Sequence, residues 1–277
     1  MMEIYYLNAR GEKLNLVEWP YRIQTGDILN YKKEYYFSES SHGANILGFN
    51  TKISEKSITL TVSATDKKEY YAALNRFFDV VDSDTLSLTP GRLYFNGQYM
   101  RCYIFGSEKT EWEYGCNFLD NVISIVSGKP LWITEKALHF LPGGQSIQYV
   151  RSYPYDYPTD YSPVVLKDSI VNDNYSATDF RMTIYGPVVN PSVSIGENVY
   201  HVLTDIQAGE YLIIDTREKV VEQYDGTGGM VQKYNSRDKT HEIYAKIQPG
   251  VNTVLWDGAF GFDITTFAER SEPKWTL

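Results

Sequence analysis

The chain has 277 residues, with 26 lysines and arginines against 35 aspartates and glutamates, and a formal net charge of −9. Hydrophobic residues make up 43% and charged residues 22%, which excludes global disorder, and a chain of this length buries enough surface to need no disulfide scaffold. The acidic balance argues against a nucleic-acid coat or a polybasic membrane binder, and no apolar run approaches the ~20 residues of a membrane-spanning helix. We expect no signal peptide, because no basic region followed by an apolar run opens the sequence.

The N-terminal region is predicted to be rich in β-strands. Residues 4–7 are expected to form the opening strand, and Asn-Ala-Arg-Gly at 8–11 a turn. Residues 57–63 alternate strictly, with Ile58, Leu60 and Val62 on one face and serines and threonines on the other. This period of two is typical of a half-buried strand.

One segment, residues 66–82, is predicted to be a helix. Asp66 is a plausible N-cap with Glu69 three residues later. The apolar residues then follow three-four spacing, which predicts one face turned to a core. They are Tyr70, Ala73, Leu74, Phe77, Phe78 and Val81.

A hairpin is predicted next, because Asn96-Gly97 separates two apolar runs and both residues tolerate a positive φ. Residues 112–126 are expected to be further strand, in one or two pieces. Cys102 and Cys116 would both lie in strands, and buried free thiols are favoured over a disulfide, whose geometry the sequence does not reveal.

From residue 134 the residue composition of the chain changes. Pro142-Gly-Gly144 is a break, and residues 149–163 hold five tyrosines and three prolines. This proline density disfavours a helix or a central strand and predicts an extended crossover at a domain boundary near 134–160. The tyrosines could stack on sugar rings or seal a domain or subunit interface, and the interface is the favoured interpretation.

The C-terminal region is predicted to be a run of short strands, which indicates a β-sandwich. Asp225-Gly226 and Pro249-Gly250 supply turns. Residues 134–277 carry 12 basic and 19 acidic residues, net −7, so most of the acidity lies here. The strands are expected at 179–185, 193–195, 199–203, 211–215, 220–224, 242–247 and 251–256.

No constellation of catalytic or metal-binding residues emerges. The four histidines form no zinc motif, and a lone strand histidine is more often a packed or surface residue. The glycine-rich stretch 226–233 resembles a phosphate loop only superficially, and a hairpin loop is the favoured interpretation. Some pair among the 35 acidic residues could meet the spacing of a glycosidase by chance, but no sequence spacing singles one out. No catalytic, cofactor-binding or metal-binding residue is therefore predicted. The histidines are His42, His139, His201 and His241.

The order of motifs in the C-terminal half resembles that of siphophage distal tail proteins, the Dit family. A strand ending in Gly186-Pro187 is followed by Asn190-Pro191, and then by Gly-Glu-Tyr-Leu-Ile-Ile-Asp-Thr at 209–216. Pro-Gly-Val-Asn-Thr-Val follows at 249–254, and the chain closes on Glu269-Arg270 and Trp275. Lys-Pro-Leu-Trp-Ile at 129–133 resembles the end of the family's first domain.

The resemblance implies a mainly β fold and a structural, non-enzymatic role in the virion. Residues 1–133 would be a ring-forming, tail-tube-like β-sandwich with one helix, 134–163 the crossover, and 164–277 a galectin-like β-sandwich. The family implies a homo-hexameric ring, assembled in the bacterial host cytoplasm. It would join the tail-tube protein to the tail-associated lysin or fibre protein and to receptor-binding components, without sequence-specific nucleic-acid binding or membrane insertion.

A carbohydrate-binding protein is the alternative from a different class, with the C-terminal sandwich recognising host cell-wall glycans. A galectin-type site needs a surface aromatic ring beside polar and basic side chains on adjacent strands. Trp256, His241 and Arg181 are residues of the right types, although their spacing does not reproduce a binding signature.

Overall fold

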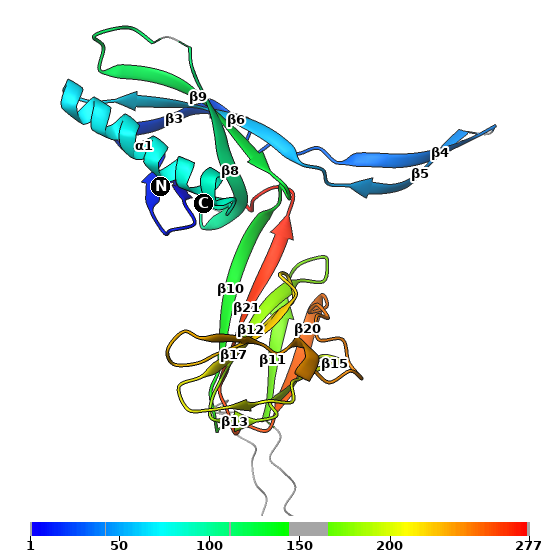
Figure 1. Ribbon diagram of the computed structural model, residues 1–277. Coiled ribbons are helices and arrows are strands. Elements are labelled where there is room, and N and C mark those ends of the chain that lie inside the picture. The colour runs from blue at the N-terminus through cyan, green and yellow to red at the C-terminus, as the bar shows by residue number, and fades with distance from the viewer. Residues whose placement is uncertain (1, 42, 111, 144–165, 276–277) are drawn as a thin grey trace, which may run out of the picture. The chain divides into compact units, whose positions relative to one another are not determined.

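The computed structural model describes residues 2–41, 43–110, 112–143 and 166–275. The fold is mainly β, as predicted, and the described residues contain one α-helix and one short 3-10 helix. The chain divides into two compact units, the first formed by residues 1–134 and 269–277 and the second by residues 135–268 (Figure 1). Strands β10 (Trp132–Phe140) and β21 (Phe262–Arg270) carry the chain from one unit into the other.

The first unit contains two sheets that share the long strand β8 (Gln98–Lys109). Residues up to Cys102 pair with β7, and residues from Tyr103 pair with β9. Because β8 pairs with a different neighbour in each half, it connects the two sheets into two layers. Apolar side chains from both layers form the core of the unit. The first sheet runs β8, β7 (Gly91–Phe95), β1 (Ile4–Leu7), β2 (Lys13–Asn15), and the second runs β8, β9 (Phe118–Ser127), β6 (Ser54–Ser63), β3 (Tyr21–Gly26).

Helix α1 (Lys67–Ser87) packs its buried side chains into this core. The Asp66 side chain accepts a hydrogen bond from Glu69 N at 2.8 Å, which confirms the predicted N-cap. The helix ends five residues later than predicted, because polar contacts replace the apolar ones in its last turns. Asp84 is completely buried and accepts hydrogen bonds from Tyr6 Oη at 2.6 Å and Ala9 N at 2.9 Å.

The predicted opening strand and the Asn96-Gly97 hairpin are confirmed, and residues 57–63 lie within β6. The prediction that strand begins at residue 112 is wrong, since β9 starts at Phe118. Both cysteines are free thiols, as favoured. Burial raises the pKa of Cys102 to about 12, but Cys116 lies in an exposed loop, so its predicted burial in a strand is wrong.

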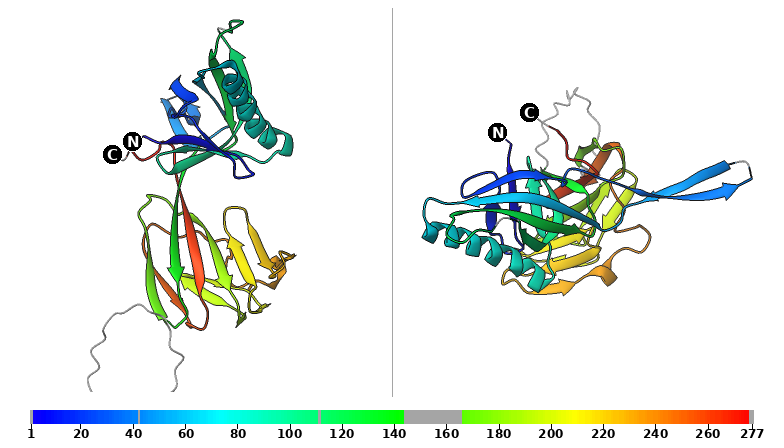
Figure 2. Two further views of the ribbon diagram at one scale, coloured as in Figure 1. Left: turned by 90° about the vertical axis from the view of Figure 1, so that its left-hand side faces the viewer. Right: turned by 90° about the horizontal axis from the view of Figure 1, so that it is seen from above.

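The second unit is built from two facing sheets whose apolar side chains meet in one core (Figure 2). Its small additional pieces are β13 (Val188–Val189), which pairs with β16 (Asp205–Ile206), and the 3-10 helix Tyr234–Ser236. One sheet runs β10, β21, β12 (Asp179–Tyr185), β17 (Tyr211–Asp215), β18 (Val220–Tyr224), β19 (Met230–Gln232); the other runs β11 (Leu166–Asn172), β20 (Gly250–Trp256), β14 (Ser192–Ile195), β15 (Asn198–His201).

The strands predicted at 179–185, 211–215 and 220–224 have the expected bounds, and the glycine-rich stretch forms the β18–β19 hairpin as favoured. The predicted strand at 242–247 is wrong. Ile243 and Ile247 are buried, but the backbone between them is irregular, because side chains satisfy it: Asn198 Nδ2 donates to Glu242 O and Tyr200 Oη to Ala245 O. The tyrosine- and proline-rich segment 149–163 lies outside the described residues.

Gly91 shows how closely the helix and the first sheet approach each other. A Cβ at this position would lie 2.2 Å from Tyr6 Oη and 2.5 Å from Asp84 Oδ2. We expect Gly91→Ala to displace this buried hydrogen-bonded pair and to lower the free energy of unfolding by about 1–3 kcal/mol or more. Urea denaturation followed by circular dichroism measures the change.

Gly128→Ala is the matched control, because a Cβ there meets nothing within 4 Å. Equal stability of the two variants would contradict the close approach of Tyr6, Asp84 and Gly91.

Candidate assembly surface

Strands β4 (Glu34–Ser40) and β5 (Gly43–Asn50) form a two-stranded sheet of their own. Seven residue pairs join them in antiparallel register, with a bulge between Tyr36 and Phe37. Every described residue of the two strands is exposed except Gly48, which is half-buried. In Figure 1 the hairpin, drawn in blue, projects from the other strands of its unit.

One face of this hairpin is apolar. Tyr35 lies opposite Phe49 and Phe37 opposite Ile46, and opposite residues of an antiparallel pair share a face. The rings of Tyr35 and Phe37 are 6.0 Å apart, which places the two pairs side by side. These four side chains, the apolar face of the hairpin, are each 51–64% exposed.

Such a face is costly in water. Burying one large apolar side chain stabilises a folded protein by about 1.5–3 kcal/mol relative to leaving it exposed. An isolated two-stranded hairpin has at best marginal stability in water. Soluble monomers rarely leave a contiguous apolar patch of this kind uncovered, and larger patches mark interaction sites. The hairpin therefore presents exposed apolar side chains of the kind that occur at interaction sites.

The sequence analysis assigned no role to residues 34–50. The signal that marks them is the aromatic run Tyr35-Tyr36-Phe37 followed by Gly43 and the apolar residues Ile46, Leu47 and Phe49. Polar and apolar residues do not alternate strictly in this segment, so the pattern does not predict a strand with one buried face.

A second exposed apolar surface lies at the C-terminal end of α1. Leu86 and Leu88 are 85% and 81% exposed. Leu88 adopts a left-handed conformation with φ of 53°, and its carbonyl accepts a hydrogen bond from Tyr103 Oη at 2.8 Å, which holds this end of the helix in place. The hairpin and this helix end are thus two different exposed apolar surfaces of the first unit.

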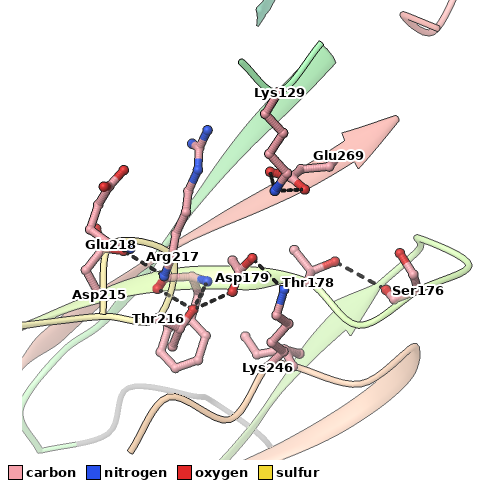
Figure 3. Close-up of polar contacts among 12 residues, drawn as sticks. Lys129, Ser176, Thr178, Asp179, Asp215, Thr216, Arg217, Glu218, Lys246 and Glu269 are labelled. Carbon is pink, nitrogen blue, oxygen red and sulfur yellow. Dashed lines mark hydrogen bonds and ion pairs between the residues drawn. The ribbon is translucent and has the colours of Figure 1, made fainter. Parts of the chain in front are cut away.

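Asp215 and Thr216, the last two residues of the 209–216 motif, are engaged in contacts inside the second unit (Figure 3). Thr216 Oγ1 accepts from Phe180 N at 2.9 Å and donates to Asp179 Oδ1 at 3.1 Å. Lys246 Nζ lies 2.8 Å from the other oxygen of Asp179.

Asp215 and Gly186 are also engaged in contacts inside the second unit. Asp215 Oδ1 accepts from the N–H groups of residues 217 and 218, both at 3.0 Å, and its other oxygen accepts from Arg181 Nε at 2.8 Å. A Cβ on Gly186 would lie 2.1 Å from Gln207 O, so only glycine fits there. These residues therefore support the fold of the second unit.

Two of the four histidines gather on one carboxylate. His201 Nδ1 and His241 Nδ1 lie 3.6 and 3.7 Å from Asp238 Oδ2. The pKa of Asp238 is lowered, chiefly by the Thr240 N–H that donates to it. His139 pairs with Asp263, and His42 lies outside the described residues.

Across the described ranges, no cluster of three or more His, Cys, Asp or Glu side chains is arranged to hold a metal ion. No helix in this part of the chain is both long and apolar enough to cross a membrane.

The structure does not support the set of Trp256, His241 and Arg181 as a sugar site. Trp256 is only 6% exposed and packs edge-on against Phe140 and Phe262, so it offers no surface ring. Arg181 pairs with Asp215, and His241 pairs with Asp238.

Comparisons with solved structures match nearly the whole chain. SPP1 Dit, described as a paradigm of the hub adsorption apparatus in phages that infect Gram-positive bacteria, has 10% identity and a TM-score of 0.62, with 98% of this chain and 99% of that chain covered. A chain of the phage P2 baseplate, in its activated conformation with Ca, has 12% identity and a TM-score of 0.67, with 99% and 100% covered. The corresponding baseplate with Sr gives the same values.

No protein-family model matches the sequence, and no curated protein matches it. At these identities the likeness is one of fold. The chain has the fold of Dit and baseplate hub proteins, which confirms the sequence-based resemblance to the distal tail proteins at that level.

Thr216 offers a test of the structural role of the motif. We expect Thr216→Val to lower the free energy of unfolding of the second unit by about 1–3 kcal/mol, because Phe180 N–H and Asp179 Oδ1 each lose a hydrogen bond in the core. Urea denaturation followed by tryptophan fluorescence measures the change.

Thr265→Val is the matched control, because Thr265 is a half-buried threonine on β21 of the same unit. A Thr216 variant as stable as this control would contradict the assigned role.

Proposed function

We propose that this protein is a structural component of a phage tail tip, of the distal tail type. The observation that carries the proposal is the fold likeness to SPP1 Dit and to the P2 baseplate chain, which extends over at least 98% of this chain in each case. A likeness confined to one unit would fit many β-sandwich proteins, whereas agreement over two linked units and their connections is far more restrictive.

Within that role, we propose a homo-hexameric ring that joins the tail-tube protein to the tail-associated lysin or fibre protein and to receptor-binding components. Assembly would occur in the bacterial host cytoplasm. The apolar face of the β4–β5 hairpin supports a subunit contact, because its four exposed aromatic and aliphatic side chains suit an apolar surface of a second copy. The exposed helix end at Leu86 and Leu88 is a surface of that kind.

We propose that residues 1–133 form the ring, 134–163 the crossover and 164–277 the second domain. Two observations support this division. The hairpin and the helix end both belong to the first segment. That segment carries 14 basic and 16 acidic residues, so little like-charge repulsion opposes close packing of several copies.

The proposed role is non-enzymatic. In the described residues, the histidines and the buried carboxylates are engaged in contacts that stabilise loops and strand ends. The proposal also includes no sequence-specific nucleic acid and no membrane insertion.

The apolar face of the hairpin provides the decisive experiment. We expect the wild-type chain to give a hexamer by native mass spectrometry and a ring by electron microscopy. The triple variant Phe37→Ser, Ile46→Ser, Phe49→Ser is expected to shift the population to monomers with little change in thermal unfolding, because exposed side chains contribute little to the stability of the isolated chain.

The matched control is Tyr175→Ser, Val189→Ser, Val251→Ser, which removes three even more exposed apolar side chains from the second unit. It should leave the hexamer intact. A wild-type chain that stays monomeric at high concentration and binds neither the tail-tube nor the tail-associated protein would overturn the proposed function. A hexamer that survives the triple hairpin substitution would overturn the role of the hairpin alone.

A further inference from the structure

The base of the β4–β5 hairpin surrounds a small pocket with lysines. The pocket has a volume of about 20 Å³, and Lys32, Lys33 and Lys56 line it. Residues 30–33 lead into β4, and residues 51 and 54 follow β5, so the pocket lies where the hairpin joins its unit. All its lining residues belong to the first unit. This site, the lysine pocket, has room for one group of the size of a water molecule or a ligand oxygen.

Lys56 places a buried ammonium group at this pocket. The residue is only 8% exposed. Its Nζ donates to Asn30 O and to Asp27 O, the latter at 3.4 Å, which leaves one of three N–H groups unused. Burial lowers the pKa of Lys56, and the charge of Asp27 opposes that shift. A buried charge in this situation is stabilised when an anionic group contacts it.

Lys32 and Lys33 add two exposed positive charges to the same pocket. Among the described residues, no carboxylate lies within ion-pair distance of either lysine or of Lys56. Lys52 differs from them, because it pairs with Glu34. Three like charges repel one another at close range, so the lysine pocket favours an anionic group.

The C-terminal half of α1 carries the opposite charge. Residues 77–88 contain three aspartates and no lysine, arginine or histidine. Two of the three, Asp79 and Asp82, are exposed and have no ion-pair partner in the part of the chain that the structure describes. The last turn of the helix also has no basic residue to offset the negative end of the helix dipole. This end of the helix is therefore stabilised by cations that another molecule supplies.

The two charged groups lie at similar distances from apolar side chains. Asp82 and Asp79 precede Leu86 by four and seven residues, which places them on one helix face, about 6 Å and about 10 Å from it along the axis. Lys33 precedes Tyr35, on the apolar face of the hairpin, by two residues, or about 7 Å of extended chain. A helix whose Leu86 contacts the apolar face can therefore place a carboxylate at Lys33.

We propose that the lysine pocket receives a carboxylate of Asp79 or Asp82 from a second copy of this chain, while Leu86 and Leu88 of that copy contact the apolar face of the hairpin. The inference rests on the proposed function and deepens it, because it names the charged groups that orient the subunit contact. The contact joins two copies, since the lysines and these aspartates do not pair within one chain. Complementary charges of this kind select the partner and fix its register.

Charge reversal tests this pairing. The variant Lys32→Glu, Lys33→Glu and the variant Asp79→Lys, Asp82→Lys each place like charges across every subunit contact. By native mass spectrometry, each variant alone should be monomeric at a concentration at which the wild type is hexameric. An equimolar mixture should form hexamers again, because alternation of the two variants around the ring joins opposite charges at every contact. With one variant labelled with 15N, the mass of these hexamers should show equal numbers of both.

Lys136→Glu, Lys239→Glu is the matched control, because these two lysines are exposed residues of the second unit and the net charge changes by the same amount. It should remain hexameric. All the substituted residues are exposed, and circular dichroism verifies that every variant is folded.

The outcomes separate this inference from the proposed function. A hexamer of either charge-reversed variant alone, or a mixture of the two that stays monomeric, would overturn the pairing and leave the proposed function in place. A wild-type chain that does not assemble would overturn both, because the inference rests on the subunit contact.

Discussion

The constraint on which this structure depends is that each pair of β-strands must have one face covered. Both units satisfy it with a second layer, and the two cores contain the side chains that alternate inward along their strands. The β4–β5 hairpin does not satisfy it within the described chain, since the side chains on its apolar face stay more than half exposed. The hairpin thus gathers four exposed apolar side chains on one projecting element, and in our proposal a second copy of the chain covers them.

A projecting apolar arm and an exposed apolar helix end have a simple consequence for assembly. Because the two surfaces differ, a contact between them is head-to-tail, and repetition of such a contact gives either a closed ring or an open filament. Our proposal is the closed form. The near balance of charge in residues 1–133 is compatible with close packing, since short-range contacts would then decide the geometry.

Much of the fold could be predicted where hydrophobic period and turn chemistry agree. Asn96-Gly97 and the run before Gly186-Pro187 are such places, and there the predicted strands coincide with or overlap the observed ones. The helix start was predictable because Asp66 caps it, but the helix end was not, because Asp84 is buried through hydrogen bonds to residues far away in the sequence. The prediction of a strand at residues 242–247 failed although its apolar pattern was correct. Ile243 and Ile247 are buried as they would be in a strand, but hydrogen bonds from distant side chains satisfy backbone carbonyls that a neighbouring strand would otherwise pair with.

The candidate surfaces were harder to predict than the fold, for a related reason. The motifs that made the resemblance visible contain residues such as Asp215, Thr216 and Gly186, which are engaged in contacts inside the second unit. Residues of this kind determine how the chain folds, and they carry no information about the molecules that the protein binds.

The side chains that meet a second copy in our proposed function lie outside these motifs. Phe37 and Phe49 belong to no motif at all. A chain can therefore keep the fold of a hub protein at 10–12% identity while its exposed residues adapt to different partners.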